Sequence, residues 1–233
     1  MRKYEQETPR SRTAVTVQHA TLLWLRSQIA AGAFRPGTQL RQETLAKECG
    51  VSVPPVREAL KTLEAEGQVV YAPHRGYFVA ALSYPELAET YRIRDLLESE
   101  AIHRAVPTLG KDDMARMREA IDDIELAHRR DDLSTISEAN RRFHFTLFDA
   151  AEMPRMVEII RVMWESTDRY RSLYFSSREH RVRVNSEHRA IMRAVRAHDA
   201  ESASELLRIH RENALEALRV AIVREGSEHP QPA

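Results

Sequence analysis

Histidines in the second half of the chain have the spacing of a metal site. Asn140 and His144 lie four residues apart in a segment with helical periodicity, so their side chains project from one face of a helix. His188 and His210 lie in two later helical segments. Three imidazoles and an amide oxygen from three helices could hold Zn²⁺, Ni²⁺ or Mn²⁺ and leave coordination positions open for a carboxylate. On spacing alone, the alternative that each histidine is an ordinary surface or core residue stays open.

Basic side chains in the first half have the spacing of a DNA-reading helix, which is expected to begin at Ser52. On this helix Val53, Arg57 and Lys61 follow one another at intervals of four residues. Arg57 could donate two hydrogen bonds to guanine O6 and N7, and Lys61 is suited to a phosphate. The free backbone N–H groups behind Ser52 could bind another phosphate. The opposite face carries an apolar stripe formed by Val56, Leu60 and Leu63.

Two further groups flank this helix. Arg41 opens the preceding helix, from which it could approach a phosphate or a base. His74, Arg75 and Gly76 form the tip of an expected hairpin, which suits the minor groove. The alternative for Arg57 is an ion pair with a neighbouring acidic side chain on a solvated surface.

The elements around these residues follow the order of a winged helix-turn-helix. Three helical patterns are followed by a change to β periodicity on both sides of a turn. The helices and strands are expected near residues 22–30, 45–49, 52–66, 69–71 and 77–79. Six longer helical patterns come next, near residues 85–105, 111–130, 133–151, 154–175, 178–198 and 200–224. The sequence therefore predicts a mainly α protein, with a winged helix-turn-helix over residues 15–82 and an all-α six-helix bundle over residues 84–225.

Charge and composition narrow the class of protein. Up to Ser83, 11 Lys and Arg residues stand against 7 Asp and Glu, whereas from Tyr84 onward 24 stand against 28. The first part is thus the better anion binder, although the whole chain has no net charge. The single cysteine, Cys49, cannot close an internal disulfide, and no apolar stretch is long enough for a membrane span or a signal peptide. We expect a cytoplasmic protein with no membrane partner.

The first part resembles the DNA-binding domain of the GntR family. The segments PGTQLRQETLAKECGVSVPPVREALKTLEAEGQVV and HRGYFV carry this resemblance, which covers about residues 17–80. It implies binding of double-stranded operator DNA by a homodimer. The family usually has an arginine where this chain has Val53 and a threonine or similar residue where it has Pro54. This departure removes one guanine contact that the resemblance implies, so the resemblance does not give the operator sequence, whereas phosphate contacts by Arg41, Arg57 and the wing are still expected.

The second part resembles the ligand-binding domain of the FadR subgroup of that family, in its FCD-type, VanR-like form, over about residues 84–224. The segments YRIRDLLESEAI, NRRFHFTLFDAAEMPRM and NSEHRAIMRAVRAHDAESA carry the resemblance. In metal-containing members an Asp-x-x-x-His pair and two later histidines bind the ion. These positions fall here on Asn140, His144, His188 and His210. Because Asn140 stands where aspartate is commoner, the site lacks one negative charge.

The resemblance also implies an effector site. The resemblance implies that Arg94 faces a cavity, where its guanidinium would hold an effector carboxylate. The spacing between Arg94 and Glu98, taken alone, equally fits an i,i+4 ion pair. Asn213, one turn beyond His210, is a second candidate for the pocket wall. We expect a DNA-binding transcriptional repressor controlled by a small organic acid beside a divalent transition metal.

Two other functions remain open at this point. One is a metal-dependent hydrolase with Glu187 as the base, but no Gly-rich phosphate loop, GxSxG or HExxH motif supports it, and an enzyme is not expected. The other is a metal that only stabilises the helical bundle.

Overall fold

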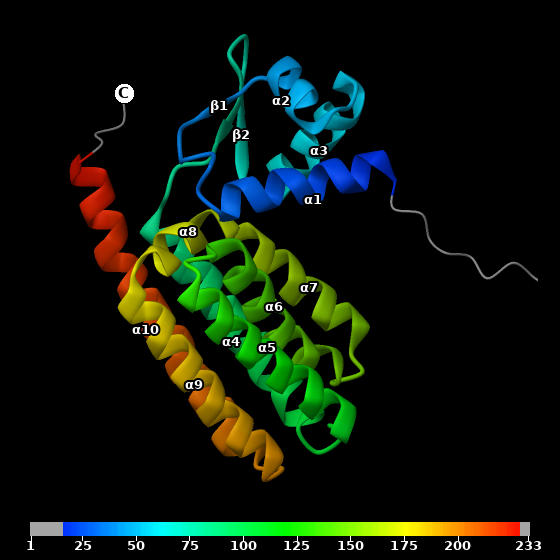
Figure 1. Ribbon diagram of the computed structural model, residues 1–233, viewed down its shortest axis with the longest axis vertical. Coiled ribbons are helices and arrows are strands. Elements are labelled where there is room, and N and C mark those ends of the chain that lie inside the picture. Colours follow the sequence, from blue (N-terminus) through cyan, green and yellow to red (C-terminus); the bar gives the residue numbers. More distant parts are fainter. Residues whose placement is uncertain (1–15, 229–233) are drawn as a thin grey trace, which may run out of the picture.

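The structure, a computed structural model, describes residues 16–228, so the expected domain start at residue 15 lies outside the described residues. Three helices and a small antiparallel sheet form the N-terminal part (Figure 1). These elements are α1 (Val17–Ala30), β1 (Gln39–Leu40), α2 (Gln42–Cys49), α3 (Val53–Ala65), β2 (Val69–Ala72) and β3 (Gly76–Val79).

An apolar core holds the three helices and the sheet together. Leu25 of α1, Leu60 of α3 and Val79 of β3 are fully buried in it. α2 ends at Gly50, whose φ of 66° is a left-handed conformation that glycine adopts without steric cost. The tight turn after Gly50 brings α3 back across α2, and the outer sides of α2, α3 and the hairpin stay in solvent.

The sheet has one strand more than the sequence predicted. β2 and β3 pair from Val69 opposite Val79 to Ala72 opposite Gly76, which confirms the expected hairpin. β1 pairs with the other edge of β3, and the strand order is β1-β3-β2. A strand of two residues is too short to show an alternating pattern, so nothing local could reveal β1.

The C-terminal part is entirely helical over the residues that the structure describes. Its helices are α4 (Tyr84–Ala105), α5 (Lys111–Arg129), α6 (Leu133–Asp149), α7 (Pro154–Ser166), α8 (Asp168–Ser176), α9 (Arg178–Arg196) and α10 (Ala200–Glu228). The predicted fold class, a winged helix-turn-helix followed by an all-α domain, is confirmed. The helix expected over residues 154–175, however, is divided into α7 and α8.

The division lies at Thr167. Its backbone N–H and its hydroxyl both donate to the carbonyl of Trp164, at 3.1 and 2.8 Å, so the α-helical pattern stops there. Neither proline nor glycine marks the break. Thr167 has φ −98° and ψ 3°, and α8 starts in a new direction directly after it.

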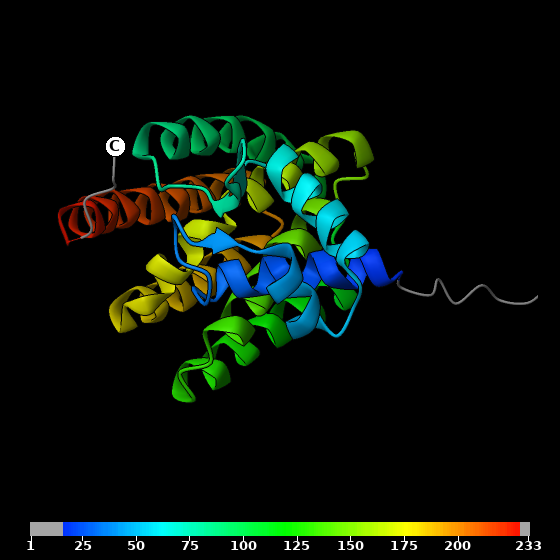
Figure 2. The same cartoon turned by 90° about the horizontal axis from the view of Figure 1, so that it is seen from above.

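The long helices run roughly side by side along the long axis of the molecule, and α1 lies across their end (Figures 1 and 2). α8 lies at this end too, in contact with α1. Two buried apolar clusters fill the bundle, one around Phe143 and Ile191, the other around Tyr170 and Val184. Among the described helices, none is long and apolar enough to cross a membrane.

Candidate functional site

Three of the four predicted metal ligands converge in the interior of the bundle. His144 of α6, His188 of α9 and His210 of α10 each offer a nitrogen atom, and these atoms all lie within 4.8 Å of one another. The Nε2 atoms of His144 and His188 are 3.1 Å apart. Two imidazole nitrogens that bind one ion with bonds of about 2.0–2.1 Å are separated by roughly 3–3.4 Å, so the cluster fits a transition metal.

The chemistry of the cluster also fits a metal. Burial lowers the pKa of His144 well below its usual value, and the neighbouring His188 and His210 lower it further. Burial likewise lowers the pKa of His188, with His210 as the second cause. Neutral imidazole is the form that binds metals. The Nδ1 atoms of His144 and His188, on the other side of each ring from Nε2, are buried and have no hydrogen-bond partner among the described residues.

Glu187 orients one of these histidines. Its Oε2 lies 2.6 Å from Nδ1 of His210, and its Oε1 accepts a hydrogen bond of 2.7 Å from the amide of Asn213. A carboxylate on the far nitrogen of a ligating histidine fixes the ring and makes it a better ligand. Asn213 is therefore engaged with Glu187 and does not line the cavity, which corrects its predicted role in effector binding.

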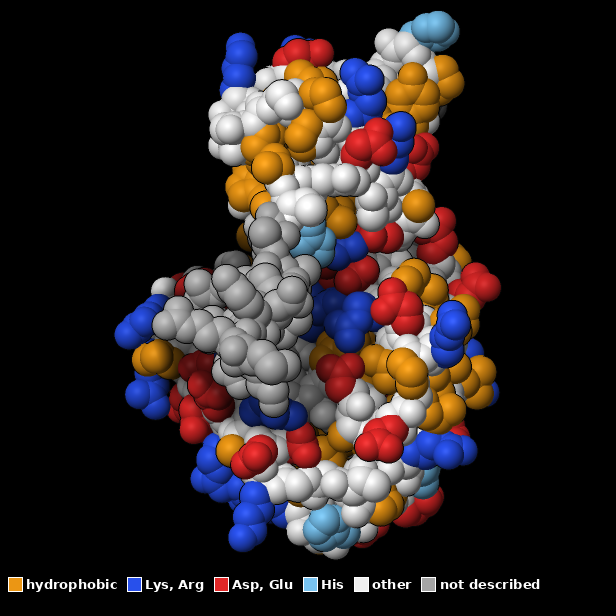
Figure 3. All heavy atoms as spheres, turned by 90° about the vertical axis from the view of Figure 1, so that its right-hand side faces the viewer, with side chains coloured by type: hydrophobic (Ala, Val, Ile, Leu, Met, Phe, Trp, Pro, Cys, Tyr) orange, Lys and Arg blue, Asp and Glu red, His pale blue; other side chains and the backbone are white. Residues whose placement is uncertain are grey.

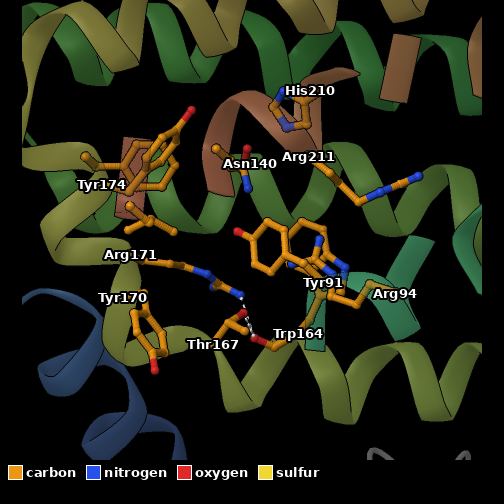
Figure 4. A pocket seen from close by; sticks show the side chains of 13 residues that line it. Tyr91, Arg94, Asn140, Trp164, Thr167, Tyr170, Arg171, Tyr174, His210 and Arg211 are labelled. Carbon is orange, nitrogen blue, oxygen red and sulfur yellow. Dashed lines mark hydrogen bonds between the residues drawn. The ribbon is translucent and has the colours of Figure 1, made fainter. Parts of the chain in front are cut away.

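A cavity of about 50 Å³ opens beside the histidines. Asn140, one turn before His144, and His210 belong to its wall (Figure 4). So do three guanidinium groups, those of Arg94, Arg171 and Arg211, and no carboxylate is among the described residues that line it. The rest of the wall is mostly aromatic and apolar, and it consists of Tyr91, Trp164, Thr167, Tyr170, Tyr174, Phe175, Ala214 and Leu218.

Arg94 combines the two arrangements that the sequence left open. It lines the cavity, and its Nε also donates to Oε1 of Glu98 at 2.8 Å. This pair is buried rather than solvated, since Arg94 is 5% exposed and Glu98 is 0% exposed. The guanidinium carbon of Arg94 lies 4.2 Å from the ring centroid of Trp164, a cation–π contact.

Glu98 is the centre of a buried polar network behind the cavity wall. It accepts hydrogen bonds of 2.7 Å from Nη1 of Arg211 and from Nε1 of Trp164, in addition to the one from Arg94. Burial alone would raise the pKa of Glu98, but Arg94 and Arg211 outweigh it and the pKa is lowered. The spacing of Arg94 and Glu98 was visible in the sequence, whereas nothing local pointed to Arg211 or Trp164.

The predicted DNA-reading residues lie at the end of the molecule away from the bundle, on α2, α3 and the hairpin (Figure 1). Arg57 is exposed, and its Nε donates to Gln42 of α2 at 3.3 Å rather than to an acidic neighbour. Lys61, also exposed, pairs with Glu58 at 2.9 Å. Ser52 is the exposed N-cap of α3 and makes no side-chain cap hydrogen bond.

Val53 differs from the prediction. It is half-buried and packs against the core of the N-terminal part, so it does not share the outward face of Arg57. With 3.6 residues per turn, positions four apart drift by about 40° around a helix. Val53 therefore lies about 20° from Leu60, on the border of the buried face.

Arg41 and the wing are connected. Nε of Arg41 donates to Gln39 at 3.2 Å, and the amide of Gln39 donates to the carbonyl of Arg75 at 2.6 Å. His74 and Arg75 are exposed at the hairpin tip, where His74 has φ 63° and Gly76 has φ 88°. These residues lie beside the start of α2, on the same end of the molecule as Arg57.

Side chains around the α7–α8 junction join the two parts of the chain. Arg26 of α1 bonds both to Glu66, at the end of α3, and to Glu165 of α7, where Nη2 lies 3.0 Å from Oε2. Arg169 donates to the carbonyl of Gly67 at 2.6 Å. Arg171 lies 2.7 Å from Asp168. The side chains of Arg169 and Arg171 are both largely buried.

Comparison with known proteins agrees with this architecture. Residues 22–79 match the model of bacterial regulatory proteins of the gntR family, and residues 89–213 match the FCD domain. The HTH-type transcriptional regulator McbR of Escherichia coli K12 is 33% identical over 140 residues, which are 60% of this chain and 63% of McbR. The HTH-type transcriptional repressor GlaR of the same organism is 27% identical over 200 residues, 80% of this chain and 89% of GlaR.

Solved structures have the same fold. That of E. coli McbR/YncC aligns with a TM-score of 0.80 at 25% identity and covers 89% of this chain and 99% of its own. That of a regulator described as GntR from Rhodococcus sp. RHA1 aligns with a TM-score of 0.76 at 24% identity, covering 88% and 98%.

Proposed function

Because the chain belongs to the gntR family of bacterial transcriptional regulators and carries an FCD domain, we propose that it is a homodimeric repressor controlled by a small organic acid. Residues 15–82 bind double-stranded operator DNA in the cytoplasm, and residues 84–225 bind a divalent metal and the acid. The observation that carries this proposal is the buried cluster of three histidines, one of which, His210, lines a cavity together with three arginines.

The metal is held by His144, His188 and His210, with Asn140 as the fourth protein ligand. Zinc, nickel and manganese all accept imidazole and oxygen ligands. When bound, the ion supplies a positive charge and open coordination positions for an acid. The absence of an acidic side chain from the described cavity wall argues against hydrolysis, because no residue there could act as a general base beside the metal.

The effector carboxylate binds between the metal and the Arg94 guanidinium. Glu98 takes only the Nε donor of Arg94, so its Nη groups remain for the ligand. Trp164 stacks under the same guanidinium and limits its movement. The network around Glu98 therefore preorganises the arginine before the acid arrives.

Exposed apolar side chains support a dimer. Ile93 and Leu96 on α4 are 38% and 59% exposed, and Ile159 and Val162 on α7 are 49% and 37% exposed. α4 and α7 contact each other, and hydrophobic side chains gather between charged ones on this side of the helical domain (Figure 3). Symmetric pairing of two such faces would remove them from water and join two DNA-binding domains.

DNA is read by α3 and the wing of each protomer. Arg57 contacts a base edge in the major groove, while Arg41, Lys61 and the N-terminus of α3 at Ser52 contact phosphates. Arg75 and its neighbours in the wing approach the minor groove. The two copies of α3 in a dimer would meet half-sites about 34–36 Å apart.

The junction between α7 and α8 transmits the signal. Trp164, Thr167 and Arg171 face the cavity, whereas Glu165 and Arg169, in the same short segment, bond to the end of α3 through Arg26 and Gly67. An acid that shifts this segment alters the orientation of α3. The acid acts only through a difference in its affinity for the two arrangements.

The test is operator binding by the metal-loaded protein. Operator fragments are selected from genomic DNA, and binding is followed by fluorescence anisotropy with and without small carboxylic acids. Sequence-specific binding that a carboxylic acid weakens supports the proposal. Binding that is equal for all duplexes, or specific binding that no carboxylic acid changes in the metal-loaded protein, would refute it.

A further inference from the structure

The effector cavity is rich in hydrogen-bond donors at both of its ends. Arg94 and Arg211 reach it from α4 and α10, and Arg171 reaches it from α8 on the other side (Figure 4). Two buried polar atoms of the wall, Nε of Arg211 and the hydroxyl of Tyr174, have no partner among the described residues. Tyr174 is 7% exposed. A ligand that completes this wall must supply acceptor atoms at more than one point.

Arg171 has donors to spare for such a ligand. Its contact with Asp168, 2.7 Å long, and its hydrogen bond of 3.3 Å to the carbonyl of Trp164 both use Nη2. Its Nε and Nη1 groups donate no hydrogen bond within the described part of the chain, and the side chain is 13% exposed. This is a site for a second acidic group, separate from the Arg94 end of the cavity.

Charge balance leads to the same conclusion. Each cavity arginine has an acidic partner behind the wall: Glu98 lies between Arg94 and Arg211, and Asp168 pairs with Arg171. The metal ligands add no negative charge, because imidazole binds an ion in its neutral form and Asn140 is an amide. The carboxylate of Glu187, 2.6 Å from Nδ1 of His210, offsets only one of the two charges of a divalent ion, and uncompensated charge in a buried site is costly.

We propose that the effector is a short dianionic acid, with one carboxylate beside the metal and Arg94 and the other on Arg171. This inference rests on the proposed function and names the class of its ligand. Asn140 and Arg171 determine the preference, Asn140 because it adds no negative charge beside the ion and Arg171 because it receives the second group. The cavity volume of about 50 Å³ corresponds to only about three to five water molecules, so the acid is short.

The experiment is isothermal titration of the zinc-loaded full-length protein with matched acids, namely malonate against propionate and succinate against butyrate. We expect each dicarboxylate to bind about 10- to 100-fold more tightly than its monocarboxylate partner, as one additional charge-assisted contact would give. Arg171→Gln should reduce this ratio toward one and leave the monocarboxylates unchanged. Arg171→Lys keeps the charge and should retain part of the ratio.

Asn140→Asp tests the charge argument separately. It should shift the preference toward monocarboxylates while elemental analysis still finds one zinc ion per chain. Arg118→Gln, an exposed position on α5, is the matched control and should change nothing. Equal affinity of the wild type for the two members of each pair, or an unchanged ratio in Arg171→Gln, overturns the dianion. If none of the four acids binds the zinc-loaded wild type, acid binding itself fails, and with it the proposed function.

Discussion

The buried network around Glu98 allows a sharp test of how the cavity wall is held. Glu98 is 0% exposed and accepts three hydrogen bonds, from Arg94, Arg211 and Trp164. Glu98→Gln keeps the shape of the side chain but removes its charge, and its new NH₂ group meets N–H donors. Arg94 then remains buried without its anion, and Arg211 keeps only its contact with Asp95. Breaking a buried pair in this way costs about 3–5 kcal/mol.

The magnitude converts to a large change in melting temperature. For a chain of this size 1 kcal/mol corresponds to about 2–4 °C, so Glu98→Gln should lower the Tm by roughly 6–20 °C. The assay is thermal unfolding followed by circular dichroism, in excess chelator so that metal binding does not contribute. Glu100→Gln is the matched control, because Glu100 lies on the same helix and pairs with Arg104 at 2.6 Å in solvent.

The control should lose about 0.5 kcal/mol or less, since exposed i,i+4 pairs contribute little. The comparison therefore isolates burial, because both variants remove one carboxylate of an i,i+4 pair on α4. If Glu98→Gln melts within about 1 kcal/mol of Glu100→Gln, the burial of the pair does not determine its energy. The account of a preorganised Arg94 would then be wrong.

Three more outcomes follow from the arrangement of the side chains. Arg57→Ala should reduce discrimination between operator and unrelated DNA by about 1–3 kcal/mol, measured by competition binding; an unchanged ratio removes Arg57 from the reading face. His144→Ala combined with His188→Ala should leave no stoichiometric metal by elemental analysis. The metal-free wild type should lose stability as pH falls below about 6.5, because these histidines take up protons in the unfolded chain but stay neutral in the folded one. The free energy of unfolding should fall by up to about 1.4 kcal/mol per pH unit for each histidine. A flat stability profile from pH 7.5 to 5.5 contradicts that reasoning. Leu96→Asp should produce monomers by analytical ultracentrifugation whereas Leu126→Asp on α5 should not, and a dimeric Leu96→Asp protein would rule out the α4 face.

Local patterns were sufficient for most of the fold. The amphipathic stripe of α3, its N-cap at Ser52 and the turn between β2 and β3 all lie within a few residues of one another. The sequence therefore predicted these elements nearly to their ends. It failed at β1 and at Thr167, where the structure depends on pairing with a distant strand and on the packing of α8 against α1.

The residues of the candidate site likewise fall into those that local spacing predicted and those that only the structure revealed. The spacing of Asn140 and His144 is a property of one helix, so periodicity alone put them on one face. Arg171, in contrast, lines the cavity although no sequence pattern near it reveals one. Tyr174 and Trp164 carried no signal of their own either.

Residue types and their periodicity along each helix, which depend on the chain alone, determined the two classes of domain, the basic face of α3 and the candidate imidazole ligands. Only the tertiary structure decided that Arg211 shares Glu98 with Arg94, although 113 residues separate it from Glu98. The periodicity of apolar residues shows which side of a helix is apolar, but it does not show which other helix covers that side. The neighbours of a buried charge are set by the packing of the whole bundle, and with them the shape and charge of the cavity.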